Sequence, residues 1–309
     1  MTLALAPGKS DEFFELALSG ERTQAVQLAL ALLDEGVPLR VLLSDLIGVV
    51  QREIGSCWHR AEATSAEEHV VTGVSQATLE ALSFHAYPHP PEGTVVVACA
   101  EGEWHSLPAQ MFAVGLQAEG QGVLFLGGST PAQDVASLLE RRRPDALAVS
   151  CSLLESVFGV ARLSDAAHSH GIPVLAGGRG LTAARASMLG ADAWAADIPS
   201  VASLLRDWRQ NPPKVETDPV ELSLVAVELD ARAEEFGAVA FEKLAQRFAP
   251  MATYNQHQRA RTHEDLVSIV RFAAAARLVD DDEAFSNSPA GLKSYWLPAG
   301  SQLLLSPQA

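Results

Sequence analysis

The feature that most constrains the fold is a change of hydrophobic period at Thr94. From there to about Arg209, short apolar runs alternate with stretches of helical periodicity. Apolar strands separated by helices of this length are typical of a parallel, doubly wound α/β sheet. We therefore predict a Rossmann-like domain over residues 91–212. Its five strands are expected at 94–99, 122–126, 146–151, 173–176 and 191–196.

The region before the sheet predicts a helical domain over residues 1–90. Four segments of helical periodicity, joined by short turns, lie between residues 10 and 86 and favour an antiparallel four-helix bundle. The fourth segment is expected to begin at Thr64 or Ser65, with acidic residues in its first turn. The proline-rich stretch 87–93 is interpreted as a linker.

The region after the sheet predicts a mostly α-helical C-terminal domain over residues 213–309. Residues 220–248 contain few helix breakers, and a further helix is expected from about His263 to Leu278. The polar stretch 253–265 is interpreted as a connection between these helices.

Composition excludes several classes of function. The formal net charge of −16 argues against non-specific binding to nucleic acid and against docking on anionic membranes. The start of the chain does not resemble a signal peptide, and no apolar stretch approaches about 20 residues. Three widely spaced cysteines fit a reducing compartment. We therefore expect a cytoplasmic protein.

A Glu-x-His pair occupies the turn after the first predicted strand. In doubly wound sheets, ligands bind beyond the carboxyl ends of the strands, where this turn lies. A neutral imidazole is a good ligand for transition metals, and it needs an acceptor to hold its second nitrogen. Glu103 and His105, with Trp104 between them, therefore form a candidate metal site. The alternative is a structural or exposed loop histidine.

These residues carry a resemblance. The region from Thr94 to about Arg209 resembles a cobalamin-binding domain, a family with Asp-x-His-x-x-Gly after the first strand. This chain has Glu-Trp-His-Ser-Leu-Pro over 103–108, so glutamate replaces the aspartate and Pro108 replaces the glycine. The resemblance implies that His105 is the lower axial ligand of cobalt and that Glu103 accepts its second N–H.

Two later segments resemble the slot that holds the nucleotide tail in this family. The segment SCSLLES (150–156) stands in place of a Ser-x-Leu loop, and AGGRG (176–180) stands in place of a Gly-Gly pair. Glycines suit a slot where a bulky tail lies against bare backbone. The resemblance implies that the slot is lined by Ser150, Ser152, Leu153, Gly177 and Gly178.

The predicted bundle carries a second resemblance. The segment CWHRAEATSAEEH (57–69) contains Trp-x9-Glu-His, which is similar to the bundle signature of B12-dependent photoreceptors of the CarH type. The resemblance implies that Trp58 packs on the adenosyl group of adenosylcobalamin and that Glu68 binds its ribose. It also implies that His59 ligates cobalt after light and that His69 is the signature histidine. The alternative is structural, and for Glu67 we favour a helix-capping role.

The order of the domains resembles that of photocobilins, in which a cobalamin domain adjoins a helical bilin-binding domain. Arginines can pair with bilin propionates. The candidate residues for biliverdin are Tyr254, His257, Arg259, Arg261 and His263. No cysteine follows Cys151, so a bilin in this domain would be held without a thioether bond. The alternative is a solvated loop.

The resemblances together imply a light-sensing signalling protein rather than an enzyme. It would bind adenosylcobalamin and biliverdin, form a homo-oligomer, and act on a downstream protein partner without contacting DNA. Two other functions remain open. One is a corrinoid carrier for methyl transfer, which has the same order of bundle and sheet. The other is a regulatory interaction protein with a vestigial pocket, which Pro108 favours.

Overall fold

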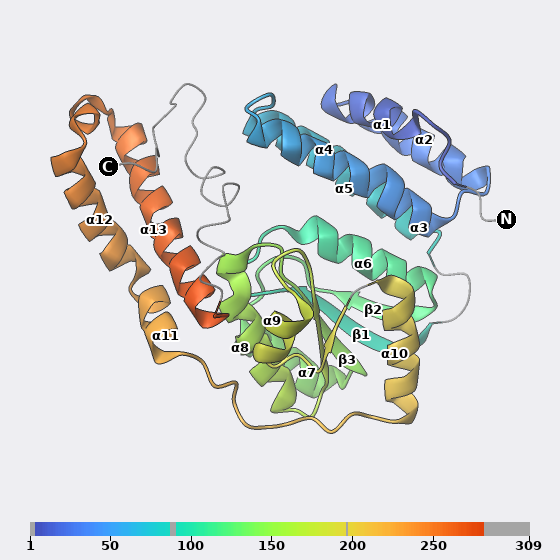
Figure 1. Cartoon of the computed structure of the whole chain (residues 1–309). Coiled ribbons are helices and arrows are strands. Elements are labelled where there is room, and N and C mark those ends of the chain that lie inside the picture. Colours follow the sequence, from blue (N-terminus) through green and yellow to red (C-terminus); the bar gives the residue numbers. More distant parts are fainter. Residues whose placement is uncertain (1–3, 87–90, 196, 281–309) are drawn as a thin grey trace. The chain divides into compact units, whose positions relative to one another are not determined.

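The computed structural model describes residues 4–86, 91–195 and 197–280. The chain divides into two compact units, Met1–Val220 and Glu221–Ala309 (Figure 1). The first unit contains the predicted bundle and the predicted sheet, which share one helix in their cores. The second unit is helical.

The bundle has four helical stretches within the first unit. They are α1 (Lys9–Leu18), α2 (Arg22–Asp34), a third stretch made of α3 (Leu39–Val41), η1 (Leu42–Ile47) and α4 (Gly48–His59), and α5 (Ser65–Ser83). The third stretch differs from a regular helix because η1 has π-helical hydrogen bonding. Helix α5 begins as predicted: Thr64 accepts a hydrogen bond from the backbone of Glu67, whose side chain accepts the Thr64 N–H. This capping box confirms the structural interpretation of Glu67.

The sheet is parallel and five-stranded, as the sequence predicts. Its strands are β1 (Glu92–Cys99), β2 (Gln121–Phe125), β3 (Ala146–Ser150), β4 (Val174–Gly177) and β5 (Ala193–Trp194), in the order β2-β1-β3-β4-β5. Strand β5 is shorter than the expected run, whose last residue, 196, lies outside the described residues. The order reverses at β1 and β3, and ligands bind beyond the strand ends at such a switch point.

Helices cover both faces of the sheet (Figure 1). Helices α6 (Ser106–Ala118) and α10 (Ile198–Gln210) pack on one face. Helices α7 (Ala132–Arg142) and α8 (Val157–His168) pack together, and α8 lies against β3 and β4. The remaining short elements of the unit are η2 (Leu154–Ser156) and α9 (Ala183–Met188). The result is a doubly wound, Rossmann-like domain.

Helix α6 is buried on two sides. Leu107 and Val114 belong to the core of the bundle, whereas Ala109, Ala113 and Leu116 belong to the core on the sheet. Burial of apolar area on both sides stabilises the helix at about 25 cal/mol per Å². The start of α6, which immediately follows His105, is therefore fixed relative to both the bundle and the sheet.

The second unit is built from α11 (Leu224–Ala231), α12 (Ala233–Arg247), η3 (Ala249–Thr253) and α13 (Gln256–Leu278). The predicted start of the last helix at about His263 is wrong. Asn255 and Gln258 form a capping box that begins α13 at Gln256, so most of the predicted connection is helical. In the part of the chain that the structure describes, no helix is long and apolar enough to cross a membrane.

Substitution of Gly159 tests how closely α8 packs against the turn after β1. A Cβ at this position would overlap the backbone nitrogen and oxygen of Glu101, in the turn after β1. We expect Gly159→Ala to lower the free energy of unfolding by about 3 kcal/mol in urea titrations. Gly73→Ala, in α5 and with open space around its Cβ, is the matched control and should stabilise by up to about 1 kcal/mol. Equal effects of the two substitutions would contradict this packing.

Candidate functional site

The carboxylate of Glu103 is the centre of the turn between β1 and α6. Its side chain is fully buried, and both of its oxygens accept hydrogen bonds. Oε1 accepts the backbone N–H of His105 at 2.9 Å and lies 2.6 Å from its ring Nδ1. Oε2 accepts the backbone N–H groups of Ser152 at 2.8 Å and Leu153 at 2.9 Å. One carboxylate thus ties the turn after β1 to the loop after β3.

This carboxylate fixes the tautomer of His105. An ionised carboxylate only accepts hydrogen bonds, so Nδ1 carries the proton and Nε2 of the neutral ring has a free lone pair. Burial acts to raise the pKa of Glu103, but the hydrogen bonds from His105 and from the backbone outweigh it and the pKa is lowered. The side chain of His105 is 59% exposed, so its Nε2 is available to a ligand.

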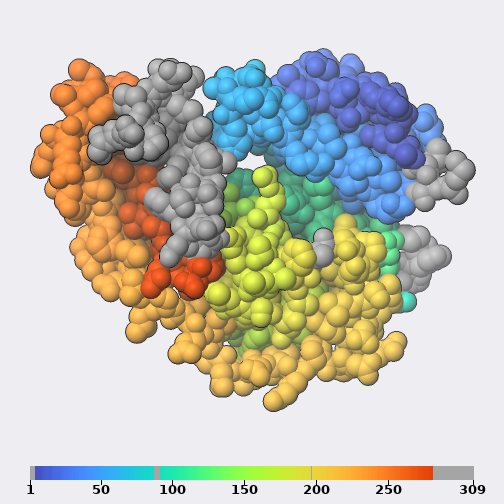
Figure 2. All heavy atoms as spheres, viewed as in Figure 1, coloured from blue at the N-terminus to red at the C-terminus, as the bar shows by residue number. Residues whose placement is uncertain are grey.

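The pKa of His105 is raised above its usual value. The hydrogen bond to Glu103 is the largest cause, burial opposes it, and the charges of Glu103, Glu68 and Glu155 add to the rise. Glu68 lies in the first turn of α5, in the bundle. Figure 2 shows the surface hollowed between the blue bundle and the green-to-yellow α/β part.

The residues of the bundle signature lie at facing ends of α4 and α5. The ring of Trp58 is half-buried, its N–H donates to the Ser65 hydroxyl at 3.1 Å, and its centroid lies 5.2 Å from the ring of His59. Glu68 is one-third exposed, and His69 Nε2 lies 3.6 Å from Glu68 Oε2. The structure therefore brings the four signature residues of the bundle to the adjoining ends of α4 and α5.

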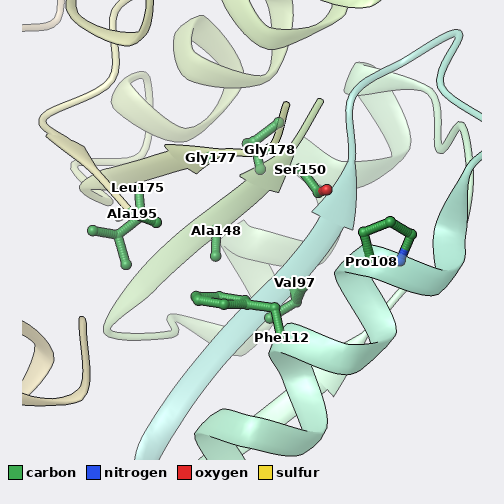
Figure 3. A pocket seen from close by; sticks show the side chains of 10 residues that line it. Val97, Pro108, Phe112, Ala148, Ser150, Leu175, Gly177, Gly178 and Ala195 are labelled. Atoms are coloured by element: carbon green, nitrogen blue, oxygen red, sulfur yellow. The ribbon is translucent and has the colours of Figure 1, made fainter. Parts of the chain in front are cut away.

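A slot opens at the carboxyl ends of the central strands. Its volume is about 190 Å³, and its lining is mostly apolar. Figure 3 shows Phe112 extending from α6 toward Ala148, with Gly177 and Gly178 at the end of β4. The lining residues are Val97, Pro108, Phe112, Ala148, Val149, Ser150, Leu175, Gly177, Gly178 and Ala195.

Gly178 shapes this slot. Its φ is +111°, and a Cβ would overlap the carbonyl oxygen of Cys151, so only glycine fits. Of the five residues predicted to line the slot, Ser150 and the two glycines do so. Ser152 and Leu153 instead present backbone N–H groups to Glu103. That contact has no signature in the sequence, because every residue except proline carries a backbone N–H.

Pro108 is compatible with the turn. It is the third residue of α6, where backbone N–H groups have no partner within the helix, so the helix is not broken. Its ring forms part of the slot. Trp104 is 76% exposed beside Gly128, between the two residues that make the Glu103–His105 pair.

The candidate bilin residues lie in the second unit and make contacts of their own. Arg259 lies over the ring of Phe241 at 5.2 Å, and the His263 ring meets the same phenylalanine at 6.1 Å. Arg261 pairs with Glu264 at 2.8 Å. Tyr254 follows η3, and His257 is in the first turn of α13. Two of the five candidates thus converge on one aromatic ring of α12.

Comparison with known proteins agrees with this geometry. Residues 93–201 match a family model described as "B12 binding domain". This stretch is a B12-binding domain. No curated protein matches the chain.

The chain also has similar solved structures. The monomethylamine corrinoid protein of Methanosarcina barkeri aligns with a TM-score of 0.56 and 18% identity over 63% of this chain and 96% of that chain. The methanol:cobalamin methyltransferase complex MtaBC of the same organism aligns at 0.38 and 18% over 69% and 84%. A cobalamin-binding protein of Desulfitobacterium hafniense DCB-2 aligns at 0.36 and 16% over 64% and 98%. The first likeness shows a shared fold.

The residues present fit a corrinoid. Cobalt in a corrin ring already has its equatorial nitrogens, so the protein has to supply a single axial donor. His105 offers one oriented nitrogen, and the slot with bare backbone at Gly178 is a place for a displaced tail. These two features lie at the same edge of the sheet.

The Glu103–His105 pair predicts a histidine with a shifted titration in the corrinoid-free protein. We expect a pKa above the usual 6.5, measured by NMR of the imidazole nitrogens, with the signal identified through its loss in His105→Ala. Glu103→Gln removes the anionic acceptor and should lower this pKa. Glu119→Gln, at the other end of α6, is the control and should leave it unchanged. An unchanged pKa in Glu103→Gln would contradict the pairing.

Proposed function

We propose that this protein is a light sensor that binds adenosylcobalamin in its first unit, with His105 as the lower axial ligand of cobalt. The observation that carries the cobalamin-binding part of the proposal is the buried Glu103 carboxylate, which fixes the Nδ1–H tautomer and leaves the Nε2 lone pair free for cobalt. When bound, adenosylcobalamin supplies a light-sensitive cobalt–carbon bond. The protein supplies the axial nitrogen, the slot and the groups on the opposite side.

The bundle supports the adenosyl form of the cofactor. Trp58 offers a half-buried ring at the end of α4, and Glu68 offers a one-third exposed carboxylate in the first turn of α5. An aromatic face and a hydrogen-bond acceptor suit a nucleoside better than they suit a methyl group. His59 stands next to Trp58 and is exposed, and we propose that it ligates cobalt after the upper ligand leaves.

The proposed output is a shift of the bundle against the B12-binding domain. Because α6 is shared by the cores of both, a change at the bundle would be passed to the start of α6 and to His105. We propose that a protein partner, or a second copy of this chain, receives the signal.

A corrinoid carrier for methyl transfer is the second candidate. It is favoured by the fold shared with the monomethylamine corrinoid protein, whose chain is matched over 96% of its length. A carrier needs the same axial histidine and the same slot. It does not need the groups that suit a nucleoside, so the response to light separates the two functions.

The proposal predicts distinct spectra in the dark and after illumination. Protein loaded with adenosylcobalamin in the dark should change its absorption spectrum under green light. His105→Ala should lose the spectrum of the histidine-ligated form, whereas His85→Ala, at an exposed position beyond α5, should keep it. Absorption spectroscopy of the three proteins gives the result.

Two outcomes would contradict parts of this proposal. A wild-type spectrum that is stable in light would contradict the sensor and favour the carrier. A His105→Ala variant that binds and responds like the wild type would contradict the axial ligand in either function.

Biliverdin binding by the second unit is a separate proposal. It is supported by Arg259 and His263 meeting at Phe241, and by the nearby carboxyl of Asp265, whose pKa burial raises to about 6. Cationic side chains suit propionates, and a carboxyl group suits pyrrole N–H groups. Expression with biliverdin should give a far-red absorption band that weakens in Arg259→Ala. No band in the wild type would contradict the proposal.

A further inference from the structure

A chain of polar side chains joins α4 and α5 behind Glu68. The Thr72 hydroxyl lies 2.9 Å from Glu68 Oε1 and 3.0 Å from the side-chain amide of Gln51. The other end of that amide lies 2.9 Å from the hydroxyl of Ser75, whose side chain is fully buried. Glu68, Thr72 and Ser75 are spaced by four and three residues, so they share one face of α5.

The number of available protons determines which side chain donates in each of these hydrogen bonds. The Thr72 hydroxyl has one proton and cannot donate to both the Glu68 carboxylate and an amide oxygen. The carboxylate is the stronger acceptor, so it takes the proton. The oxygen and nitrogen of an amide are distinguished by the hydrogen bonds they make. The structure has Oε1 of Gln51 toward Thr72 and Nε2 toward Ser75. Exchanging the two, so that the NH2 faces Thr72 and the oxygen faces Ser75, gives each contact one donor and one acceptor.

We propose that Ser75, Gln51 and Thr72 form a one-way chain of hydrogen bonds that holds Glu68 as an acceptor for the hydroxyl groups of an upper axial ligand. In this chain Ser75 donates to Gln51, Gln51 donates to Thr72, and Thr72 donates to Glu68. Thr72 and Gln51 are then positioning residues that set a preference for a nucleoside ligand over a methyl ligand. This inference rests on the proposed function.

The second oxygen of Glu68 is the one offered to the ligand. Thr72 occupies Oε1, whereas Oε2 is 3.6 Å from His69 Nε2, which is too long for a hydrogen bond. Glu68 lies in the first turn of α5 and its side chain is one-third exposed, and the proposed function puts the upper axial ligand beside it. A ribose has two adjacent hydroxyl donors for such an acceptor, and a methyl group has none.

The first test reads the orientation of Gln51 in the protein without corrinoid. The side-chain NH2 of Gln51, assigned by its loss in Gln51→Leu, should show NMR cross-peaks to the Thr72 methyl group. Cross-peaks to the Ser75 methylene instead would overturn the direction of the chain. This readout does not depend on cofactor binding.

The second test compares dark binding of adenosylcobalamin and methylcobalamin. We expect Thr72→Val, which keeps the shape but removes the hydroxyl, to weaken adenosylcobalamin binding about 10-fold and to change methylcobalamin binding by less than about 2-fold. Thr72→Ser keeps the hydroxyl and should restore the preference.

Thr78→Val is the matched control. Thr78 is buried in the same helix, and its hydroxyl donates only to the backbone oxygen of Val74 at 3.0 Å among the contacts described there. Its loss should change thermal stability and leave both affinities unchanged. A Thr72→Val variant that behaves like Thr78→Val would overturn the positioning role.

The outcomes separate this inference from the function on which it rests. If the wild type prefers adenosylcobalamin and Thr72→Val keeps that preference, the positioning role is wrong and the proposed function stands. If the wild type binds both cobalamins equally, the adenosyl part of the proposed function is wrong, and the selecting role of the chain is wrong with it. Equal weakening for both cobalamins in Thr72→Val would mean that the substitution acts on the fold, and it would overturn the selecting role of Thr72.

Discussion

The buried carboxylate of Glu103 is the interaction on which the rest of the site depends. It accepts hydrogen bonds from two segments, the start of α6 and the loop after β3, and it stays ionised despite complete burial. A buried charge is tolerated only when its hydrogen bonds are satisfied, so the four donors are a condition for the site. The orientation of His105, its tautomer and its raised pKa all follow from this contact.

Helix α6 connects that contact to the remainder of the first unit. One of its sides belongs to the bundle core and the other belongs to the sheet core, so a movement of the bundle against the B12-binding domain would be transmitted to the turn at His105. The bundle in turn places Glu68 where its charge is felt by the histidine. The fold therefore places the imidazole of His105 before α6 and the carboxylate of Glu68 in the first turn of α5.

The sequence predicts much of this arrangement, and there is a physical reason why it does not predict the remaining contacts. The alternation after Thr94 predicts the sheet, and Glu103 with His105 in the first turn predicts the pair that the structure forms. The backbone N–H groups of Ser152 and Leu153 leave no trace in a sequence. The capping box at Asn255 was visible as Asn-x-x-Gln, but the polar run after it resembled a loop. The contact of Gln51 with Thr72 joins two helices, and local periodicity cannot give it.

The central claim is that the imidazole of His105 ligates cobalt in place of the nucleotide base of the cofactor. Electron paramagnetic resonance of the protein loaded with cobalt(II) cobalamin tests this directly, because an axial nitrogen splits the signal according to its nuclear spin. With ¹⁵N-labelled histidine in the protein and unlabelled cobalamin, the account predicts a change of each line from a triplet to a doublet. The same change should be absent in His105→Ala. A triplet that persists in the labelled wild type would show that the base of the cofactor remains bound and would contradict the account.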